Sequence, residues 1–384
     1  MFPRPALPLV ILVLTSTLAH ADWLSESSRL SEQVQISEED PNFILQYGGI
    51  ARGYYSNDQR IEWTGQEATF GAEGVGFAKL GRYEGDWSVG LTTELYLNQP
   101  YDGNILIDGP ERASFEANFR DETVELSQLG LWFETANCRF QLGKIVTPFG
   151  RHYARLYQNS RADAPFIRSE AILWRETGFS AETQRGIFNL TAAVTNGGGN
   201  RDANSSKAFI GRIGVQQEFY TLGASIKWQD GIGSENQKMY NNHFGIDGMV
   251  RYGVFRLSCE VIYDEYGFRH DYDPLTIYWG RSIYNREING TARQPKAGSG
   301  YYVTLEADFQ MFYLVTSYGQ YFPEIIGDHI QDQTTTRAIF KAAYRILPAA
   351  EAYSELILEN DVSNAQADRT RRGIMYVLGF QLAL

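Results

Sequence analysis

The chain has 384 residues, and its 46 acidic side chains outnumber its 34 basic ones, giving a formal net charge of −12 at pH 7. This acidic balance argues against a nucleic-acid partner, because nucleic-acid phosphates attract basic surfaces. The 24 Tyr, 22 Phe, 7 Trp and 37 Gly, set against only 12 Pro, favour strands and tight turns over helices.

Residues 1–21 have the composition of a secretory signal peptide. Arg4 precedes an apolar run over residues 6–18, and an Ala-x-Ala cleavage motif ends at Ala21. Cleavage there leaves 33 basic against 46 acidic side chains, a formal charge of −13. No later stretch approaches the roughly 18 to 20 uninterrupted apolar residues of a membrane-spanning helix. We therefore expect an exported chain that starts at Asp22, with an uncleaved anchor helix as the alternative.

Residues 22–42 form a polar stretch with scattered apolar side chains, DWLSESSRLSEQVQISEEDPN. This pattern predicts a periplasmic N-terminal segment ahead of the folded domain. The segment is either a short or frayed helix that helps trimer assembly or a disordered tail.

From residue 43 onward, apolar and polar residues alternate with a period of two, which is typical of strands with one apolar face. In residues 219–229, for example, Leu222 and Ile226 share one face, and Ser225 and Lys227 share the other. Sixteen such segments occur, near residues 43–55, 67–81, 87–98, 123–134, 138–144, 174–183, 185–195, 206–217, 219–229, 242–252, 254–264, 300–308, 310–319, 336–346, 350–360 and 372–384.

The connections between these segments alternate between short bends and stretches of ten or more residues. Bacterial transmembrane barrels have this asymmetry, with short periplasmic turns and long external loops. In lipid, only a closed barrel pairs every backbone donor and acceptor of such strands. The sequence therefore predicts an all-β fold over residues 43–384, a closed antiparallel transmembrane β-barrel of about 16 strands in the bacterial outer membrane. The alternative is a soluble β-sandwich or propeller whose apolar faces point inward.

The polar faces of the predicted strands carry charged residues of both signs, which are tolerable only in water or in pairs. A barrel of about sixteen strands is wide enough to enclose water, so we expect a water-filled lumen. The basic residues on these faces are Arg52, Lys79, Arg139, Arg212, Lys227, Arg251, Arg256, Arg337, Lys341 and Arg345. The acidic residues are Glu73, Glu94, Glu134, Asp247, Glu260, Asp264, Glu306, Glu351, Glu355 and Glu359.

Three motifs lie close together in the sequence: LGKIVTPFGR at 142–151, WRETGFSAE at 174–182 and FNLTAAVTNGGG at 188–199. They resemble stretches of the phosphate-selective porin O and P family. The resemblance implies a sixteen-stranded barrel, usually a homotrimer, that conducts small anions or other small solutes. The chain departs from that family's basic lumen in having only 7 Lys, and it ends in Leu384 where outer-membrane barrels usually end in Phe or Trp.

Residues 145–173 match the third external loop, which in many general porins folds back into the barrel and narrows it. Pro148 and Gly150 favour a turn near its start. The residues expected to form the pore constriction are Lys144, Arg151, Arg155, Arg161, Asp163 and Arg168. Cations at a narrowing raise the local anion concentration, because low-dielectric walls focus their field. The alternative is that the arginines clamp the loop to carboxylates of the wall.

These features predict an outer-membrane porin, surrounded by outer-membrane lipid, for passive diffusion of small hydrophilic solutes, with a preference for anions. The alternatives are a transporter for hydrophobic compounds and a surface receptor or adhesin that uses residues 265–299. No enzyme activity, cofactor or metal site is expected, because no nucleophile accompanies the four histidines after residue 21 and no two of these lie at ligand spacing. Cys138 and Cys259 are either small strand residues or one disulfide.

Overall fold

The computed structural model describes residues 33–36, 42–58, 68–98, 124–150, 175–196, 206–229, 241–266, 296–325, 333–347, 349–363 and 370–383. Every regular element within these ranges is a β-strand. Among the same residues, no helix is long and apolar enough to cross a membrane. The expected signal peptide and most of the expected N-terminal segment lie outside the described residues. Within that segment, Gln33–Ile36 forms a strand, so neither the expected helix nor the expected disordered tail holds for these four residues.

Strand lengths suit a membrane-crossing wall. From β2 onward the strands span 8 to 17 residues, close to or above the about 9 to 11 residues that a tilted strand needs to cross a bilayer. The strands are β1 (Gln33–Ile36), β2 (Phe43–Asp58), β3 (Ala68–Glu84), β4 (Trp87–Asn98), β5 (Val124–Thr135), β6 (Cys138–Val146), β7 (Arg175–Arg185), β8 (Phe188–Thr195), β9 (Ala208–Gln216), β10 (Tyr220–Trp228), β11 (Asn241–Tyr252), β12 (Phe255–Tyr266), β13 (Lys296–Asp308), β14 (Phe312–Ile325), β15 (Gln333–Leu347), β16 (Ala350–Ser363) and β17 (Thr370–Ala383).

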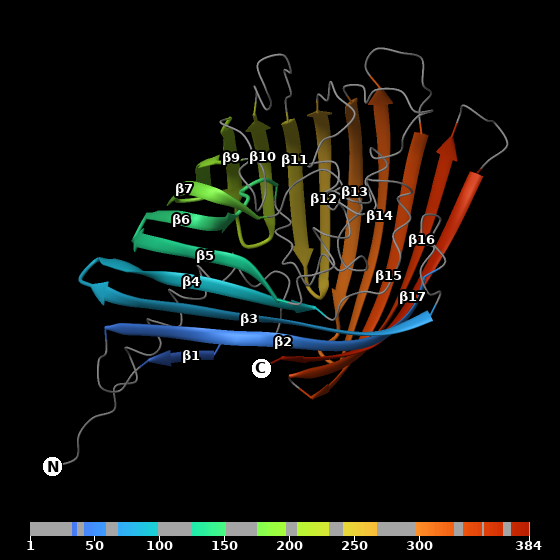
Figure 1. The fold of residues 1–384 in the computed structure, drawn as a ribbon, viewed down its shortest axis with the longest axis horizontal. Coiled ribbons are helices and arrows are strands. Elements are labelled where there is room, and N and C mark those ends of the chain that lie inside the picture. The colour runs from blue at the N-terminus through green and yellow to red at the C-terminus, as the bar shows by residue number, and fades with distance from the viewer. Residues whose placement is uncertain are drawn as a thin grey trace.

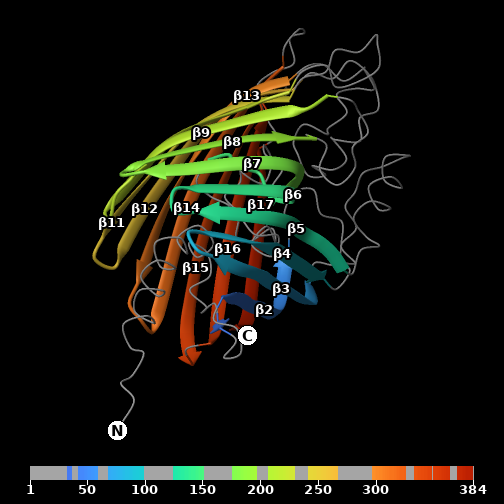
Figure 2. The same ribbon diagram turned by 90° about the vertical axis from the view of Figure 1, so that its left-hand side faces the viewer.

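Strands β2 to β17 form one closed antiparallel sheet. Each strand pairs with the next along the chain, and β17 pairs with β2 from Met375 opposite Asp58 to Ala383 opposite Ile50. Strands β2 to β6 run across strands β12 to β16 (Figure 1, Figure 2), as opposite walls of a barrel with tilted strands do. The predicted fold, a closed antiparallel barrel of about sixteen strands, is confirmed.

The short strand β1 lies on the same edge of β2 as β17 does. Gln33 lies opposite Tyr47, and Ile36 lies opposite Ile44. β17 pairs with residues 50–58 of β2, and β1 pairs with residues 44–47 of the same strand. β1 therefore continues the line of β17 and supplies hydrogen-bond partners to the part of β2 that the C-terminal strand does not reach. Without it, this edge would present unpaired backbone groups to other chains.

Short and long connections alternate around the barrel, as the sequence predicts. Two or three residues join β3 to β4, β5 to β6, β7 to β8, β9 to β10, β11 to β12, β13 to β14 and β15 to β16. The other connections between β2 and β17 span 6 to 29 residues. Because neighbouring strands are antiparallel, all the short turns lie at one end of the barrel and all the longer connections lie at the other.

The distribution of polar and apolar side chains is the reverse of that in a soluble protein: apolar side chains lie on the outer face of the wall and polar side chains on the inner face. On β10, Leu222 and Ile226 are 56% and 54% exposed on the outer face, whereas Ser225 and Lys227 are 2% and 0% exposed on the inner face. The last strand shows the same contrast at its end, with Phe380 exposed and Gln381 buried. Apolar side chains on the outside suit a hydrocarbon surrounding, and polar side chains on the inside suit a wet lumen.

Both cysteines are free thiols. Cys138 lies on β6 with its Sγ 3.7 Å from Thr183 Oγ1 of β7, and Cys259 is exposed on β12. The two are therefore small strand residues, and the alternative of a disulfide between them is not realised.

The outer face predicts how a charge there affects stability. Ile246 on β11 is 54% exposed on the apolar face, and we expect Ile246→Arg to lower the free energy of unfolding by about 2 to 4 kcal/mol if the residue lies near the bilayer midplane. Urea titration of the barrel folded into lipid vesicles measures this loss. Ile246→Leu is the matched control and should leave stability nearly unchanged. An arginine variant as stable as this control would contradict a lipid-facing outer surface.

Candidate pore-lining site

The inner face of the barrel carries charged side chains that are almost completely covered. All but one of them belong to the set that the alternation of the strands assigns to the lumen, and the exception is Glu176. Buried charges are stable only when they are paired or hydrogen-bonded. The buried charged residues of the described ranges are Arg52, Glu94, Glu176, Arg212, Lys227, Asp247, Glu260, Glu306, Arg337 and Glu355.

One ion pair joins strands that are not neighbours. The Nζ of Lys227 on β10 donates to Oε1 of Glu176 on β7, and both side chains are fully buried. Thr195, on the intervening strand β8, donates its hydroxyl to the other carboxylate oxygen of Glu176. Removing one charge of a buried pair leaves the other uncompensated, so this cluster ties β7 and β8 to β10 across the intervening strand β9.

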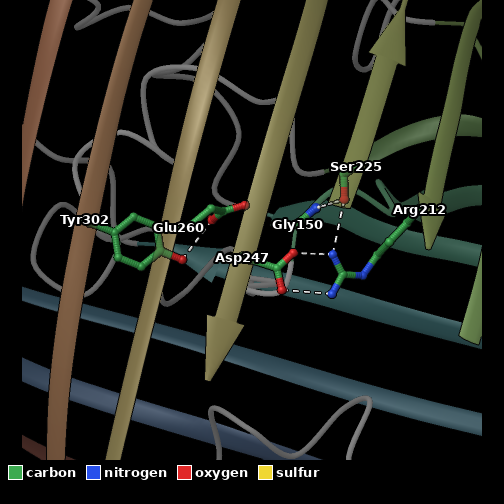
Figure 3. Close-up of polar contacts among 6 residues, drawn as sticks. All are labelled: Gly150, Arg212, Ser225, Asp247, Glu260 and Tyr302. Atoms are coloured by element: carbon green, nitrogen blue, oxygen red, sulfur yellow. Dashed lines mark hydrogen bonds and ion pairs between the residues drawn. The ribbon is translucent and has the colours of Figure 1, made fainter. Parts of the chain in front are cut away.

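A second ion pair lies beside the first on the inner wall. Arg212 on β9 binds Asp247 on β11 through both terminal nitrogens, with 2.9 Å between Nη2 and Oδ2. Its Nη1 also donates to Ser225 Oγ on β10, at 3.2 Å (Figure 3). Such a two-pronged contact fixes the guanidinium plane as well as its position. The pair therefore bridges three strands and holds the serine hydroxyl in place.

Carboxylates farther around the wall have tyrosine and arginine partners. Glu260 on β12 accepts a hydrogen bond from Tyr302 on β13, with 2.8 Å between Oε2 and the phenolic oxygen (Figure 3). Glu306 on β13 accepts from Arg256 Nε at 3.0 Å and from the hydroxyl of Tyr313 on β14. Because these bonds link side chains of adjacent strands, they add stiffness to the inner surface where backbone pairing alone does not restrain the side chains.

Along the inner face of β15 and β16, charged residue pairs alternate with apolar residue pairs. Arginine or lysine on β15 faces glutamate on β16 at every second inner position, and apolar residues face one another between these positions. Tyr353 belongs to one of the apolar pairs and has two cations near its ring, with centroid distances of 4.8 Å to Lys341 Nζ and 5.4 Å to Arg52 Cζ. The registered pairs are Arg337 with Glu359, Ile339 with Ile357, Lys341 with Glu355, Ala343 with Tyr353 and Arg345 with Glu351.

Residues 147–150 leave the end of β6 and lie against the inner face of β10 and β11. Gly150 N donates to Ser225 Oγ at 2.9 Å (Figure 3). The fully buried ring of Phe149 meets His243 edge-on, with 6.2 Å between the ring centroids. Three strands separate β6 from β10 in the wall. The chain therefore passes through the interior of the barrel here, instead of continuing outward at the end of the strand.

Lys144 occupies a different place from the one expected. It lies opposite Leu129, whose side chain is exposed on the outer face, and its Nζ donates to the backbone oxygen of Leu126 at 2.6 Å. Its neighbour Ile145 is the residue that points inward, opposite Glu176. Lys144 thus satisfies a carbonyl beyond the end of the β5 and β6 pairing, and it does not line the lumen. The other residues of the expected constriction, Arg151, Arg155, Arg161, Asp163 and Arg168, lie outside the described residues.

Three residues with clear contacts at this wall were absent from the expected site. They are Glu176, Ser225 and His243, and all three are buried on inner-facing positions. The alternation of residues identifies the face of Ser225 correctly, but it does not show which residues two or three strands away lie at the same height. The contacts of Glu176, Ser225 and His243 therefore become visible only when the strand register is known.

No family model matches this chain, and no curated protein matches it. The resemblance to the phosphate-selective porin O and P family therefore remains a prediction from three sequence motifs.

Solved structures share the architecture at low sequence identity. The outer-membrane channel DcaP of Acinetobacter baumannii has a TM-score of 0.62 at 10% identity, with 91% of this chain and 99% of that chain covered. The anion-selective porin of Comamonas acidovorans has a TM-score of 0.61 at 11% identity, covering 89% and 100%. Outer-membrane-expressed OmpT of Vibrio cholerae has a TM-score of 0.60 at 12% identity, covering 91% and 100%. At these identities the likeness shows that the chain has the fold of the porin barrels.

The buried pair of Glu176 and Lys227 predicts an asymmetric response to mutation. Glu176→Gln leaves the Lys227 ammonium buried without its counter-charge, and we expect the free energy of unfolding to fall by about 3 to 5 kcal/mol. The double variant Glu176→Leu with Lys227→Met removes both charges at similar volume and should recover most of this loss. Urea unfolding in detergent micelles measures both. Equal losses in the single and double variants would contradict an ion pair at this position.

Proposed function

We propose that the chain is a porin, a water-filled channel of the bacterial outer membrane for passive diffusion of small hydrophilic solutes. The observation that carries the proposal is the closed wall of sixteen strands with apolar residues outside and paired charges inside. Such a wall is stable in lipid because closure satisfies the backbone, and a barrel of this size encloses water. The solved structures of similar fold include proteins titled as porins and outer-membrane channels.

The proposed assembly is a homotrimer. The motifs at 142–151, 174–182 and 188–199 resemble a family that is usually trimeric. One structure of similar fold, OmpT of Vibrio cholerae, is described in a trimer form. It has a TM-score of 0.59 at 12% identity.

The proposed constriction is the connection from β6 to β7, folded into the lumen. The placement of residues 147–150 on β10 and β11 supports this, because the connection begins inside the barrel. Its four arginines outnumber its two acidic residues, Asp163 and Glu170, and would favour anions over cations near the narrowest point. Lys144 faces outward and is not part of the proposed constriction. The residues proposed to act there are Arg151, Arg155, Arg161, Asp163 and Arg168. Strict phosphate selection is not part of the proposal, because acids balance the bases along the inner wall.

A transporter for hydrophobic compounds is the second candidate, and one observation favours it. The inner face of β15 to β17 carries a cluster of buried apolar side chains, with Tyr54 and Tyr313 packed against it. A purely polar lumen would not need such a cluster. Its side chains are 0 to 5% exposed, so an amphipathic solute would reach them by displacing the side chains that cover them. The cluster consists of Ile339, Ala343, Tyr353, Ile357, Met375 and Val377.

Planar-bilayer recordings of the purified mature protein test the proposed function. A porin should give discrete, ohmic openings in KCl, and proteoliposomes should swell in small sugars at rates that fall with sugar size. A transporter for hydrophobic compounds should bind or conduct amphipathic solutes while swelling little in sugars. Silent barrels that insert without conductance would overturn the porin proposal.

The anion preference is tested by the reversal potential in a KCl gradient. Replacing Arg155 and Arg161 with Ala should shift the reversal potential away from the chloride equilibrium potential, because two cations leave the proposed narrowing. Lys207→Ala is the matched control, since this exposed lysine precedes β9 on the outward-facing side of the wall. A wild-type channel that prefers cations, with the same value in the double variant, would refute the anion preference.

A further inference from the structure

We propose that Ser225, oriented by the Arg212 and Asp247 pair, is a positioning site that holds residues 147–150 against β10 and thereby sets the width of the pore. The proposal rests on the proposed function, because it concerns the constriction of a diffusion channel. It adds a feature of its own: the pore width depends on Asp247, a residue two strands beyond Arg212 and one beyond Ser225.

The serine hydroxyl is the point where the chain and the wall meet. Ser225 Oγ accepts the backbone N–H of Gly150 at 2.9 Å and an Arg212 N–H at 3.2 Å. The residue is buried on the inner face of β10. Two donors converging on one oxygen restrict the rotamer of the serine, because the hydroxyl can serve both only in one orientation. Of the two donors, only Arg212 belongs to the wall, so its hydrogen bond is the one that orients the Ser225 hydroxyl before Gly150 docks.

Asp247 determines where the guanidinium of Arg212 lies. Both terminal nitrogens of Arg212 bind the two carboxylate oxygens of Asp247, so the guanidinium cannot rotate without breaking two charge-assisted bonds. Gly223, between Arg212 and Asp247 in the wall, makes this geometry possible. A Cβ built on Gly223 would lie 2.3 Å from Arg212 Nη2, so the guanidinium lies flat on the backbone of β10.

Phe149 adds a second contact next to the hydrogen bond. A Cβ built on Gly245 would lie 2.9 Å from two ring carbons of Phe149, so the ring rests on the bare backbone of β11. His243, two residues earlier on the same strand, meets the ring edge-on. The segment is thus fixed at two successive residues, by shape at Phe149 and by a directed hydrogen bond at Gly150.

This arrangement gives each residue a distinct expected effect on the channel. Ser225→Ala removes the acceptor of Gly150, and a hydrogen bond of this kind changes the docked to undocked ratio by about 2- to 10-fold. Ser225→Thr keeps a hydroxyl and should behave as wild type. Gly245→Ala crowds the Phe149 ring and should act in the same direction as Ser225→Ala. Asp247→Asn weakens the hold on Arg212 without touching the segment, and it should act the same way with a smaller amplitude.

The experiment is single-channel recording of the full mature protein in planar bilayers. In Ser225→Ala we expect open-channel current noise, and the time spent at a second and larger conductance level, to rise about 2- to 10-fold. Adding Asp247→Asn to Ser225→Ala should change the recordings little further, since its effect passes through the missing hydroxyl. Ser258→Ala, at another buried serine of the inner wall on β12, is the control and should leave conductance and noise unchanged.

The heat-modified mobility of each variant on gels separates positioning from folding. A merely structural serine would lower the unfolding temperature of the barrel without altering the conductance of intact channels. Wild-type conductance and noise in both Ser225→Ala and Gly245→Ala would overturn the positioning site, as would an additive effect of Asp247→Asn in the Ser225→Ala background. A wild-type barrel that inserts without conducting would instead overturn the proposed function, so the two failures are distinguishable.

Discussion

The structure depends on one constraint, the closure of the sheet between β17 and β2. Strands with one apolar face can lie in hydrocarbon only if every backbone donor and acceptor is paired, and an open edge would violate this along its whole length. Side chains reinforce the closure, because Arg52 on β2 donates to Gln381 on β17 from both Nε and Nη2, at 3.2 and 3.0 Å. The strand β1 completes the edge of β2 that β17 leaves uncovered.

Closure also determines where the charges lie. Once the apolar residues face outward, the alternation of the strands sends every intervening side chain into the interior. The strand register then determines the height of each charged side chain in the barrel. Most of them have partners on the adjacent strand or on a strand two or three places away. Arg212 with Asp247 and Lys227 with Glu176 are such pairs. The inner wall is therefore a nearly neutral, stiff surface, on which residues 147–150 find directed contacts.

The period of two was sufficient to predict the fold class and the inner or outer face of most residues. It placed Lys227 inside and Ile226 outside correctly, because each position in a regular strand determines the next. It also puts Lys144, the last residue of the predicted strand 138–144, on the outer face with Leu142, so the assignment of Lys144 to the constriction went against the period and was wrong. The period could not predict the contact between Glu176 and Lys227, since it gives the face of a residue and leaves its height in the barrel open. The constriction residues from Arg151 to Arg168 stay predictions, because they follow no strand period.

The seam between the first and last wall strands has a consequence for biogenesis. Its partners Arg52 and Gln381 are 329 residues apart in the chain, so the barrel seals only after the whole polypeptide is present. Contacts of such long separation form late, since loop-closure entropy opposes them. Until then both terminal strands expose adhesive edges, and β1 cannot take its place beside the end of β17. During that interval the two unpaired edges can pair with other chains, so the step that brings the two ends together also protects the polypeptide from aggregation.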